Sequence, residues 1–228
     1  MKKVWSAALL VALTLLAARA SATQSSPLAF VPKGYRVVDT IRGDLNKDGE
    51  EDVVLLIKAA DPSMIVSDAR GEKLDRNRRG LVIAFKQGMG YALALKNFTC
   101  FSSENEDGGV YFAPELSIDI KKGLLLFHYS HGRYGYWGYT FRYQKGGFYL
   151  IGYDASNDHG PVVESVVSIN LMTGRIWKRV NTNEDAEGGG EEDFKDSWSK
   201  ITKPRVISLE GIKDFDSLDV TDMFEVWK

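Results

Sequence analysis

The sequence has few of the residues that stabilise small disulfide-rich domains or build reactive sites. It contains one Cys in 228 residues, which excludes an internal disulfide and a zinc site made of several cysteines. Its three histidines are scattered as His128, His131 and His159. Lys and Arg (29) do not exceed Asp and Glu (31), whereas dedicated nucleic-acid binders usually carry a basic excess. We therefore expect no disulfide framework and no nucleic-acid partner.

Long apolar runs are also missing, apart from one near the N-terminus. A basic start, Met1–Lys3, precedes an uncharged stretch of residues 4–18, and Ala20-Ser21-Ala22 fits the rule for cleavage after Ala22. The stretch is shorter than the ~20 residues that a membrane-spanning helix needs. We therefore expect residues 1–22 to be a signal peptide. Residues 23–228 would then be exported to the periplasm or secreted, with no membrane span.

Recognisable catalytic motifs are absent from the sequence. It has no Gly-x-Ser-x-Gly elbow, no His-Glu-x-x-His pair and no Walker loop. His128 and His131 are three residues apart, which places them on opposite faces of a strand and disfavours a shared metal. These absences predict that the protein is not an enzyme.

Alternation of apolar and polar residues dominates the rest of the chain. Tyr35 to Ile41 alternates loosely, and Asp52 to Lys58 is almost wholly apolar, as in a strand that is covered on both faces. Elsewhere, pairs of alternating segments flank short turns that contain Gly, and each pair predicts a β-hairpin. The paired segments are 81–86 with 91–98, 116–120 with 124–129, 136–143 with 148–153, and 162–171 with 175–180.

Helical spacing is weak and occurs only near Asp193 to Ile201 and Leu209 to Phe215. No gap between strands holds a convincing crossover helix, so the sheets should be antiparallel. The prediction is an all-β fold in one domain over residues 23–228, with about ten strands and one or two short helices near the C-terminus. A curved sheet, a sandwich and an incomplete propeller all fit this pattern.

One short segment, Gly43–Asp52, has the spacing of a calcium loop. Oxygen-bearing side chains stand at loop positions 1, 3, 5 and 9, Gly49 supplies the sharp bend at position 6, and calcium takes six to eight hard oxygen ligands. Position 12, where an EF-hand needs Glu, is Leu55, and the flanking residues are strand-like. An Asn/Asp/Gly turn without a metal is the alternative. The predicted ligands are Asp44, Asn46, Asp48, Asp52 and the main-chain carbonyl of Glu50.

At residues 43–57 the sequence resembles the FG-GAP/VCBS repeat, the calcium loop of integrin-type propellers and of many exported bacterial proteins. The chain holds one copy of the motif. The resemblance implies calcium as the cofactor, bound by the five ligands named above.

Aromatic side chains fill one face of the segment Tyr136 to Tyr143. By alternation Trp137, Tyr139, Phe141 and Tyr143 share that face, which predicts half of a β core or, as the alternative, a surface that stacks sugars. The acidic segment Asn181 to Asp196 is interpreted as a solvated loop.

These features predict an exported calcium-binding protein that acts as an interaction module, with a protein partner in the periplasm. An inhibitor or immunity-type protein is the specific form of this prediction. The alternative is a hydrolase or binder that acts on a sugar or cell-wall polymer through the aromatic face.

Overall fold

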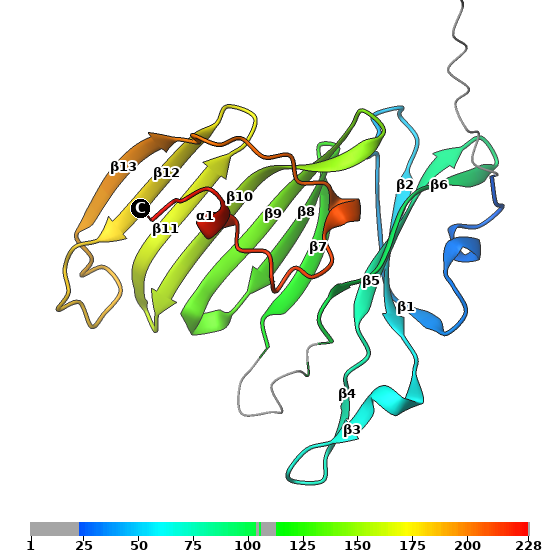
Figure 1. Ribbon diagram of the computed structural model, residues 1–228, viewed down its shortest axis with the longest axis horizontal. Helices are drawn as coiled ribbons and strands as arrows, with labels where there is room; N and C mark the ends of the chain where they lie inside the picture. The colour runs from blue at the N-terminus through cyan, green and yellow to red at the C-terminus, as the bar shows by residue number, and fades with distance from the viewer. Residues whose placement is uncertain (1–22, 104, 106–112, 228) are drawn as a thin grey trace, which may run out of the picture.

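The computed structural model describes residues 23–103, 105 and 113–227, so the predicted signal peptide lies outside the described residues. The described chain forms thirteen strands, and all their pairings are antiparallel. They make a four-stranded sheet in the order β1-β2-β5-β6, a seven-stranded sheet in the order β13-β12-β11-β10-β9-β8-β7, and the separate hairpin β3-β4 (Figure 1). The predicted all-β antiparallel class is confirmed.

The bounds of the elements follow the chain. The small sheet consists of β1 (Tyr35–Gly43), β2 (Asp52–Ala59), β5 (Arg79–Gln87) and β6 (Gly90–Phe101). The large sheet consists of β7 (Glu115–Lys121), β8 (Leu124–Ser130), β9 (Gly135–Gln144), β10 (Gly147–His159), β11 (Val162–Asn170), β12 (Arg175–Asn181) and β13 (Phe194–Lys200). The hairpin is β3 (Ile65–Ser67) with β4 (Lys73–Asp75), and the short helices are η1 (Pro27–Phe30), η2 (Pro62–Met64), η3 (Gly132–Tyr134), η4 (Leu209–Gly211) and α1 (Val220–Met223).

The four predicted hairpins are confirmed as β5–β6, β7–β8, β9–β10 and β11–β12. Each of their turns contains a glycine with a positive φ angle. A residue with a Cβ atom adopts such an angle only under strain. These glycines are Gly88 (56°), Gly123 (72°), Gly146 (80°) and Gly174 (66°).

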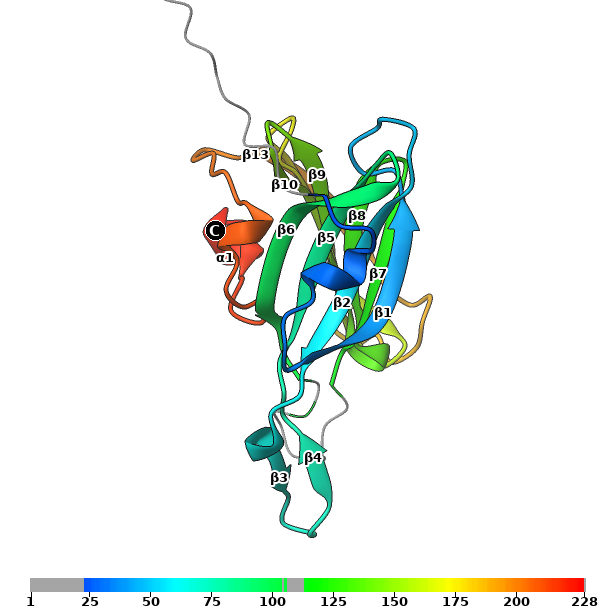
Figure 2. The same cartoon turned by 90° about the vertical axis from the view of Figure 1, so that its right-hand side faces the viewer.

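The central strands of the small sheet, β2 and β5, are buried on both faces, as the apolar sequence of β2 predicted. One face, with Val54 and Leu56, joins the main core between the two sheets. The other face, with Leu55 and Ile57, lies under Phe30 of η1 and forms a second apolar cluster. Figure 2 shows the N-terminal segment lying across this outer side of the small sheet.

The C-terminal segment, residues 201–227, runs across the inner face of the large sheet (Figure 1). Phe215 joins this segment to both sheets, because its ring stacks on Phe101 of β6 at 4.9 Å and meets Phe127 of β8 edge-on at 5.3 Å. Asn97 of β6 adds a polar anchor, since its side-chain amide donates to the carbonyls of Leu209 (3.1 Å) and Ile212 (2.6 Å).

The weak helical prediction over Asp193 to Ile201 was wrong, since residues 194–200 form β13. All residues of this edge strand are exposed, so no apolar stripe exists from which a period could be determined. Of the second predicted helix, Leu209 to Phe215, only the single 3₁₀ turn η4 forms, and the one α-helical turn lies later, at α1.

We expect Phe215→Ala to lower the free energy of unfolding by about 3–5 kcal/mol, because it removes a ring that is 2% exposed from the contact between the two sheets. Urea unfolding measures the change. Val206→Ala is the control, since Val206 lies in the same segment but is 83% exposed, and its effect should stay within about 0.5 kcal/mol. Equal losses for the two variants would contradict the role given to Phe215.

Candidate functional site: the loop between β1 and β2

The predicted calcium loop joins β1 to β2 and lies against the turn between β7 and β8. Its Leu45 is 1% exposed and belongs to the main core. A Cβ built on Gly43 would lie 2.6 Å from Cγ2 of Ile120, and one built on Gly123 would lie 3.3 Å from the carbonyl oxygen of Asp44. The loop therefore lies at the junction of the two sheets, and glycines permit the close approach on both sides.

Asp44, at the first loop position, folds the loop around its own carboxylate. Its Oδ1 accepts the amides of Lys47 (2.6 Å) and Asp48 (3.2 Å), and its Oδ2 accepts the amide of Gly49 (3.0 Å). Lys47 and Gly49 have positive φ angles of 64° and 90°, which produce the tight turn. The bend predicted at Gly49 is confirmed.

The middle of the loop is exposed and is held by shorter-range hydrogen bonds. Asn46 Oδ1 accepts the amide of Asp48 (3.0 Å), and the Asn46 side-chain amide donates to Asp48 Oδ2 (2.8 Å). Asp48 Oδ1 accepts the amide of Glu50 (2.8 Å). These oxygens are ordered by the backbone while they stay open to solvent.

Asp52 differs from the other loop carboxylates because it is 0% exposed. Its Oδ2 accepts the amides of Leu45 (2.8 Å) and Asn46 (3.3 Å), and its Oδ1 accepts the amide of Lys86 on β5 (3.0 Å). Burial raises the pKa of Asp52; the three amides act in the opposite direction, and the negative charge of Asp48 adds to the rise. Asp52 thus links the loop, β2 and β5 through its own hydrogen bonds.

The oxygen inventory of the loop fits a hard cation. Each carboxylate or amide oxygen has two acceptor positions, and the hydrogen bonds above use only part of them. One position remains on Asp44 Oδ2, on Asn46 Oδ1, on each oxygen of Asp48 and on Asp52 Oδ1, and the predicted main-chain ligand, the carbonyl of Glu50, adds one more oxygen. With water these oxygens reach the six to eight ligands that calcium takes.

The side chains of the loop nevertheless do not form a tight acidic cluster. Within residues 23–103, 105 and 113–227, no three His, Cys, Asp or Glu side chains come together in a group that could hold a metal ion. The predicted ligands Asp44, Asp48 and Asp52 thus form no such group, and the other two, the Asn46 side-chain amide and the main-chain carbonyl of Glu50, are not side chains of these four types. Calcium binding therefore stays a prediction that the donor set supports.

The aromatic face of β9 lies in the core, which was the favoured prediction. Tyr139 and Phe141 are 3% and 0% exposed, and the ring of Trp137 stacks on Tyr129 at 5.1 Å. Tyr143 is partly buried against the same core. The sugar-stacking surface expected from the alternative interpretation is thus covered by the molecule itself.

Of the two histidines near this strand, His128 lies on β8, whereas His131 follows the end of β8 and precedes η3, so the strand spacing does not apply to it. The ring of His128 lies 5.3 Å from that of Tyr136, whereas the ring of His131 lies 6.2 Å from that of Trp137 on the core side.

An ion pair that sequence reasoning missed, between the buried Lys58 and the half-buried Asp75, holds the base of the β3–β4 hairpin. Lys58 is 6% exposed, and its Nζ lies 3.2 Å from Oδ2 of Asp75 and 3.4 Å from the carbonyl of Ser103. Burial acts to raise the pKa of Asp75, but hydrogen bonds from Asn77 and Lys58 outweigh it and hold that pKa below its usual range. The sequence signal that could have indicated this pair was Lys58 itself, a single cation at the end of a strand that was predicted to be covered on both faces.

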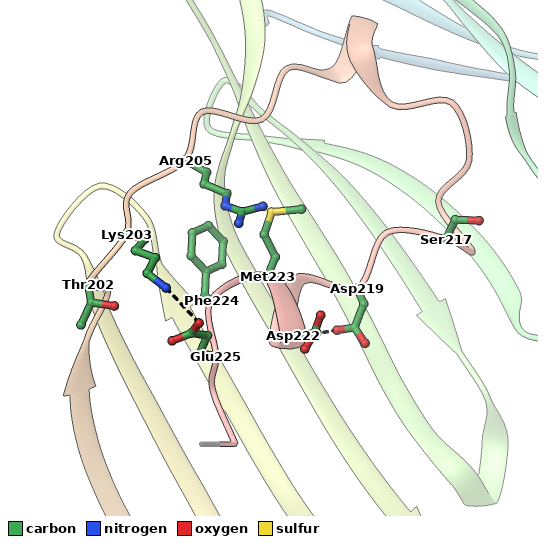
Figure 3. A pocket seen from close by; sticks show the side chains of 9 residues that line it. All are labelled: Thr202, Lys203, Arg205, Ser217, Asp219, Asp222, Met223, Phe224 and Glu225. Carbon is green, nitrogen blue, oxygen red and sulfur yellow. Dashed lines mark hydrogen bonds and ion pairs between the residues drawn. The ribbon is translucent and has the colours of Figure 1, made fainter.

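A shallow cavity of about 350 Å³ opens between the two legs of the C-terminal segment. Figure 3 shows Lys203 and Arg205 on one leg and Asp219, Asp222 and Glu225 on the other. Lys203 pairs with Glu225 at 3.2 Å, and Asp219 caps α1 by accepting the amide of Asp222 at 2.8 Å. Most of the charged side chains at this cavity pair with or cap other parts of the same segment, so we do not assign the cavity a ligand.

Comparisons with protein-family models, with curated proteins and with solved structures found no match for this chain. The resemblance of residues 43–57 to the FG-GAP/VCBS loop therefore stays a prediction from those residues. Among the described residues, no helix is long and apolar enough to cross a membrane.

We expect Asp52 to titrate above 3.8 and Asp61 below it in calcium-free buffer, because Asp52 is buried whereas hydrogen bonds from Ser63 lower the pKa of Asp61. Carboxyl chemical shifts followed through a pH titration measure both values. A raised folded-state pKa means that Asp52 contributes most to stability below the unfolded pKa, and that this contribution is lost as pH rises through the folded value. A midpoint for Asp52 below that of Asp61 would contradict the assignment.

Proposed function

We propose that this protein is exported, binds calcium through the loop between β1 and β2, and acts as an interaction module, in its specific form an inhibitor or immunity-type protein. The observation that carries the calcium proposal is the oxygen set of that loop. Side-chain oxygens of three exposed or half-buried loop residues, Asp44, Asn46 and Asp48, accept backbone amides and keep further acceptor positions that no described donor uses. The buried Asp52 anchors the loop by accepting the amide of Leu45.

The location of the loop indicates what the ion would do for the protein. Three carboxylates in one loop repel one another, and a bound cation supplies the charge that offsets this repulsion. Because Asp44 and Gly43 lie against the β7–β8 turn, fixing the loop also fixes the end of β1 and the start of β2 against the large sheet. Calcium would thus act as a structural cofactor that stabilises the junction of the sheets.

The β3–β4 hairpin supports the interaction part of the proposal. It projects from one end of the molecule, away from both sheets, in Figures 1 and 2. Its base is held by the ion pair of Lys58 and Asp75, while Met64, at the end of η2, and Ile65 of β3 are 39% and 42% exposed. A rigidly anchored hairpin that presents apolar side chains suits contact with a protein partner.

The alternative, a hydrolase or binder acting on a sugar or cell-wall polymer, depended on an accessible aromatic face on β9. With Tyr139 and Phe141 in the core, that face offers no platform for stacking. The interaction module is therefore the function that the geometry supports best.

We expect the mature chain to bind calcium in the range of about 10⁻⁴–10⁻³ M and to be stabilised by about 2.7 kcal/mol when calcium stands at 100 times its dissociation constant. Asp48→Ala should abolish this stabilisation yet change stability in chelator by no more than about 1 kcal/mol, because Asp48 is exposed. Calorimetric titration and melting in calcium and in chelator measure both effects.

Glu50→Ala is the matched control, since it removes an exposed carboxylate from the same loop but keeps the main-chain carbonyl that is the predicted ligand. It should retain calcium binding. Asp52→Ala should destabilise the protein even in chelator, by about 1–3 kcal/mol for each buried amide left without an acceptor. If Asp48→Ala costs the same stability in both buffers, the loop is only a turn and the calcium proposal fails.

A further inference from the structure

The outermost strand of the large sheet, β13, presents an open edge. All seven of its residues are exposed, with Trp198 at 63% and Phe194 at 42%. No described segment pairs with the side of β13 that faces away from β12 (Figure 1). An exposed edge strand with large apolar side chains is a template for pairing with another strand.

The direction of the free backbone groups follows from the pairing with β12. The amide of Thr182 donates to the carbonyl of Asp193 (2.7 Å), and the amide of Ile201 donates to the carbonyl of Gly174 (2.8 Å). Between the pairs Thr182–Asp193 and Gly174–Ile201 the register has no bulge. The backbone amides and carbonyls of the odd-numbered residues of β13 therefore form hydrogen bonds with β12. The amides and carbonyls of Phe194, Asp196, Trp198 and Lys200 therefore point outward, away from the sheet.

The side chains of these even-numbered residues share the outer face of the sheet with their partners on β12. Asp196 accepts two hydrogen bonds from Arg179, at 2.7 and 2.9 Å. Lys200 stands directly opposite Arg175, a like-charge pair that costs stability. Arg175 stacks on Trp198 at 4.8 Å, and among the described residues no ion pair includes Lys200.

We propose that β13 pairs antiparallel with β13 of a second copy of this chain, with the two-fold axis at Trp198. This register places Asp196 opposite the second copy's Lys200, and the reverse, so each copy supplies the carboxylate that its partner's Lys200 lacks. The two Trp198 residues face one another, and aromatic and opposite-charge pairs across strands are favourable. The two seven-stranded sheets continue into one another through an isologous contact.

Charge selects this register over its neighbours. A two-fold axis at Asp196 or at Lys200 would set like charges face to face, and an axis at Ser197 would place Asp196 opposite Trp198 without an ion pair.

The pairing is independent of the proposed calcium site. β13 and β7 are the opposite edges of the large sheet, and the calcium loop lies at the β7 edge. Self-association should therefore occur in calcium and in chelator alike, so a failure of one proposal does not affect the other.

The first experiment is disulfide trapping of the mature chain carrying Trp198→Cys. In the proposed register the two introduced thiols belong to a hydrogen-bonded pair with Cα atoms about 5.5 Å apart, which a disulfide can span. Cys100 does not compete, because it is fully buried and burial raises the pKa of its thiol to about 12. We expect a covalent dimer on mild oxidation. Phe194→Cys is the control, since its two copies would lie about 27 Å apart along the strands and should stay uncrosslinked.

The second experiment measures self-association by sedimentation equilibrium. Lys200→Asp should weaken the dimer about tenfold or more, because it sets two carboxylates opposite one another at two places. At protein concentrations low enough for both chains to be monomeric, the same variant should melt no lower than the natural chain, since it removes the clash with Arg175. Lys195→Asp makes the same charge change on the other face of β13 and should leave association within about threefold. Any one of three results would overturn the proposal. The protein could remain a monomer at every concentration up to about 1 mM, trapping through residue 194 could be as efficient as through residue 198, or the two charge changes could have equal effects.

Discussion

The inner face of the seven-stranded sheet is wider than the four-stranded sheet that packs on it, and the fold depends on how the remaining apolar surface is covered. The small sheet reaches β8 and β9 through contacts such as that of Phe101 with Phe127. Beyond these strands the C-terminal segment takes over, and Leu209, Phe215 and Val226 are each at most 2% exposed. Phe215 is the point where the three parts meet, so residues 201–227 supply part of the core.

The same junction gives Asp52 two roles that oppose one another electrostatically. Its burial supports the structure, because one carboxylate satisfies amides from the loop and from β5 that would otherwise lack an acceptor. A buried carboxylate near Asp48 also carries a desolvation and repulsion cost, which is visible in its raised pKa. A cation at the loop would remove that cost without replacing the hydrogen bonds. Asp48 is exposed and accepts hydrogen bonds only from neighbouring residues of the loop, so it has no comparable structural role.

The two edges of the large sheet differ in the way that the fold treats them. The β7 edge lies beside β1 and the loop, where glycines allow the two sheets to approach closely. At the β13 edge, Lys195 and Lys200 discourage indiscriminate pairing, as edge lysines commonly do. The order of charges along β13 still permits one self-complementary register. The β7 edge of the large sheet therefore lies beside another part of the protein, whereas the β13 edge is exposed, as the proposed self-pairing requires.

Much of this molecule follows from local sequence rules. Alternation and glycine turns determined the four hairpins, the apolar run of β2 determined a strand covered on both faces, and the spacing from Asp44 to Asp52 determined a tight oxygen-lined loop, because each depends on residues close in the chain. Tertiary structure alone decided that the rings of β9 are buried, since their cover comes from Phe215, far along the sequence. It also decided that Asp52 is anchored by Lys86 and that Lys58 finds Asp75, because long-range partners leave no periodic signal. For the same reason the exposed strand β13 escaped prediction: only its hydrogen bonds to β12, and no buried face of its own, define it as a strand.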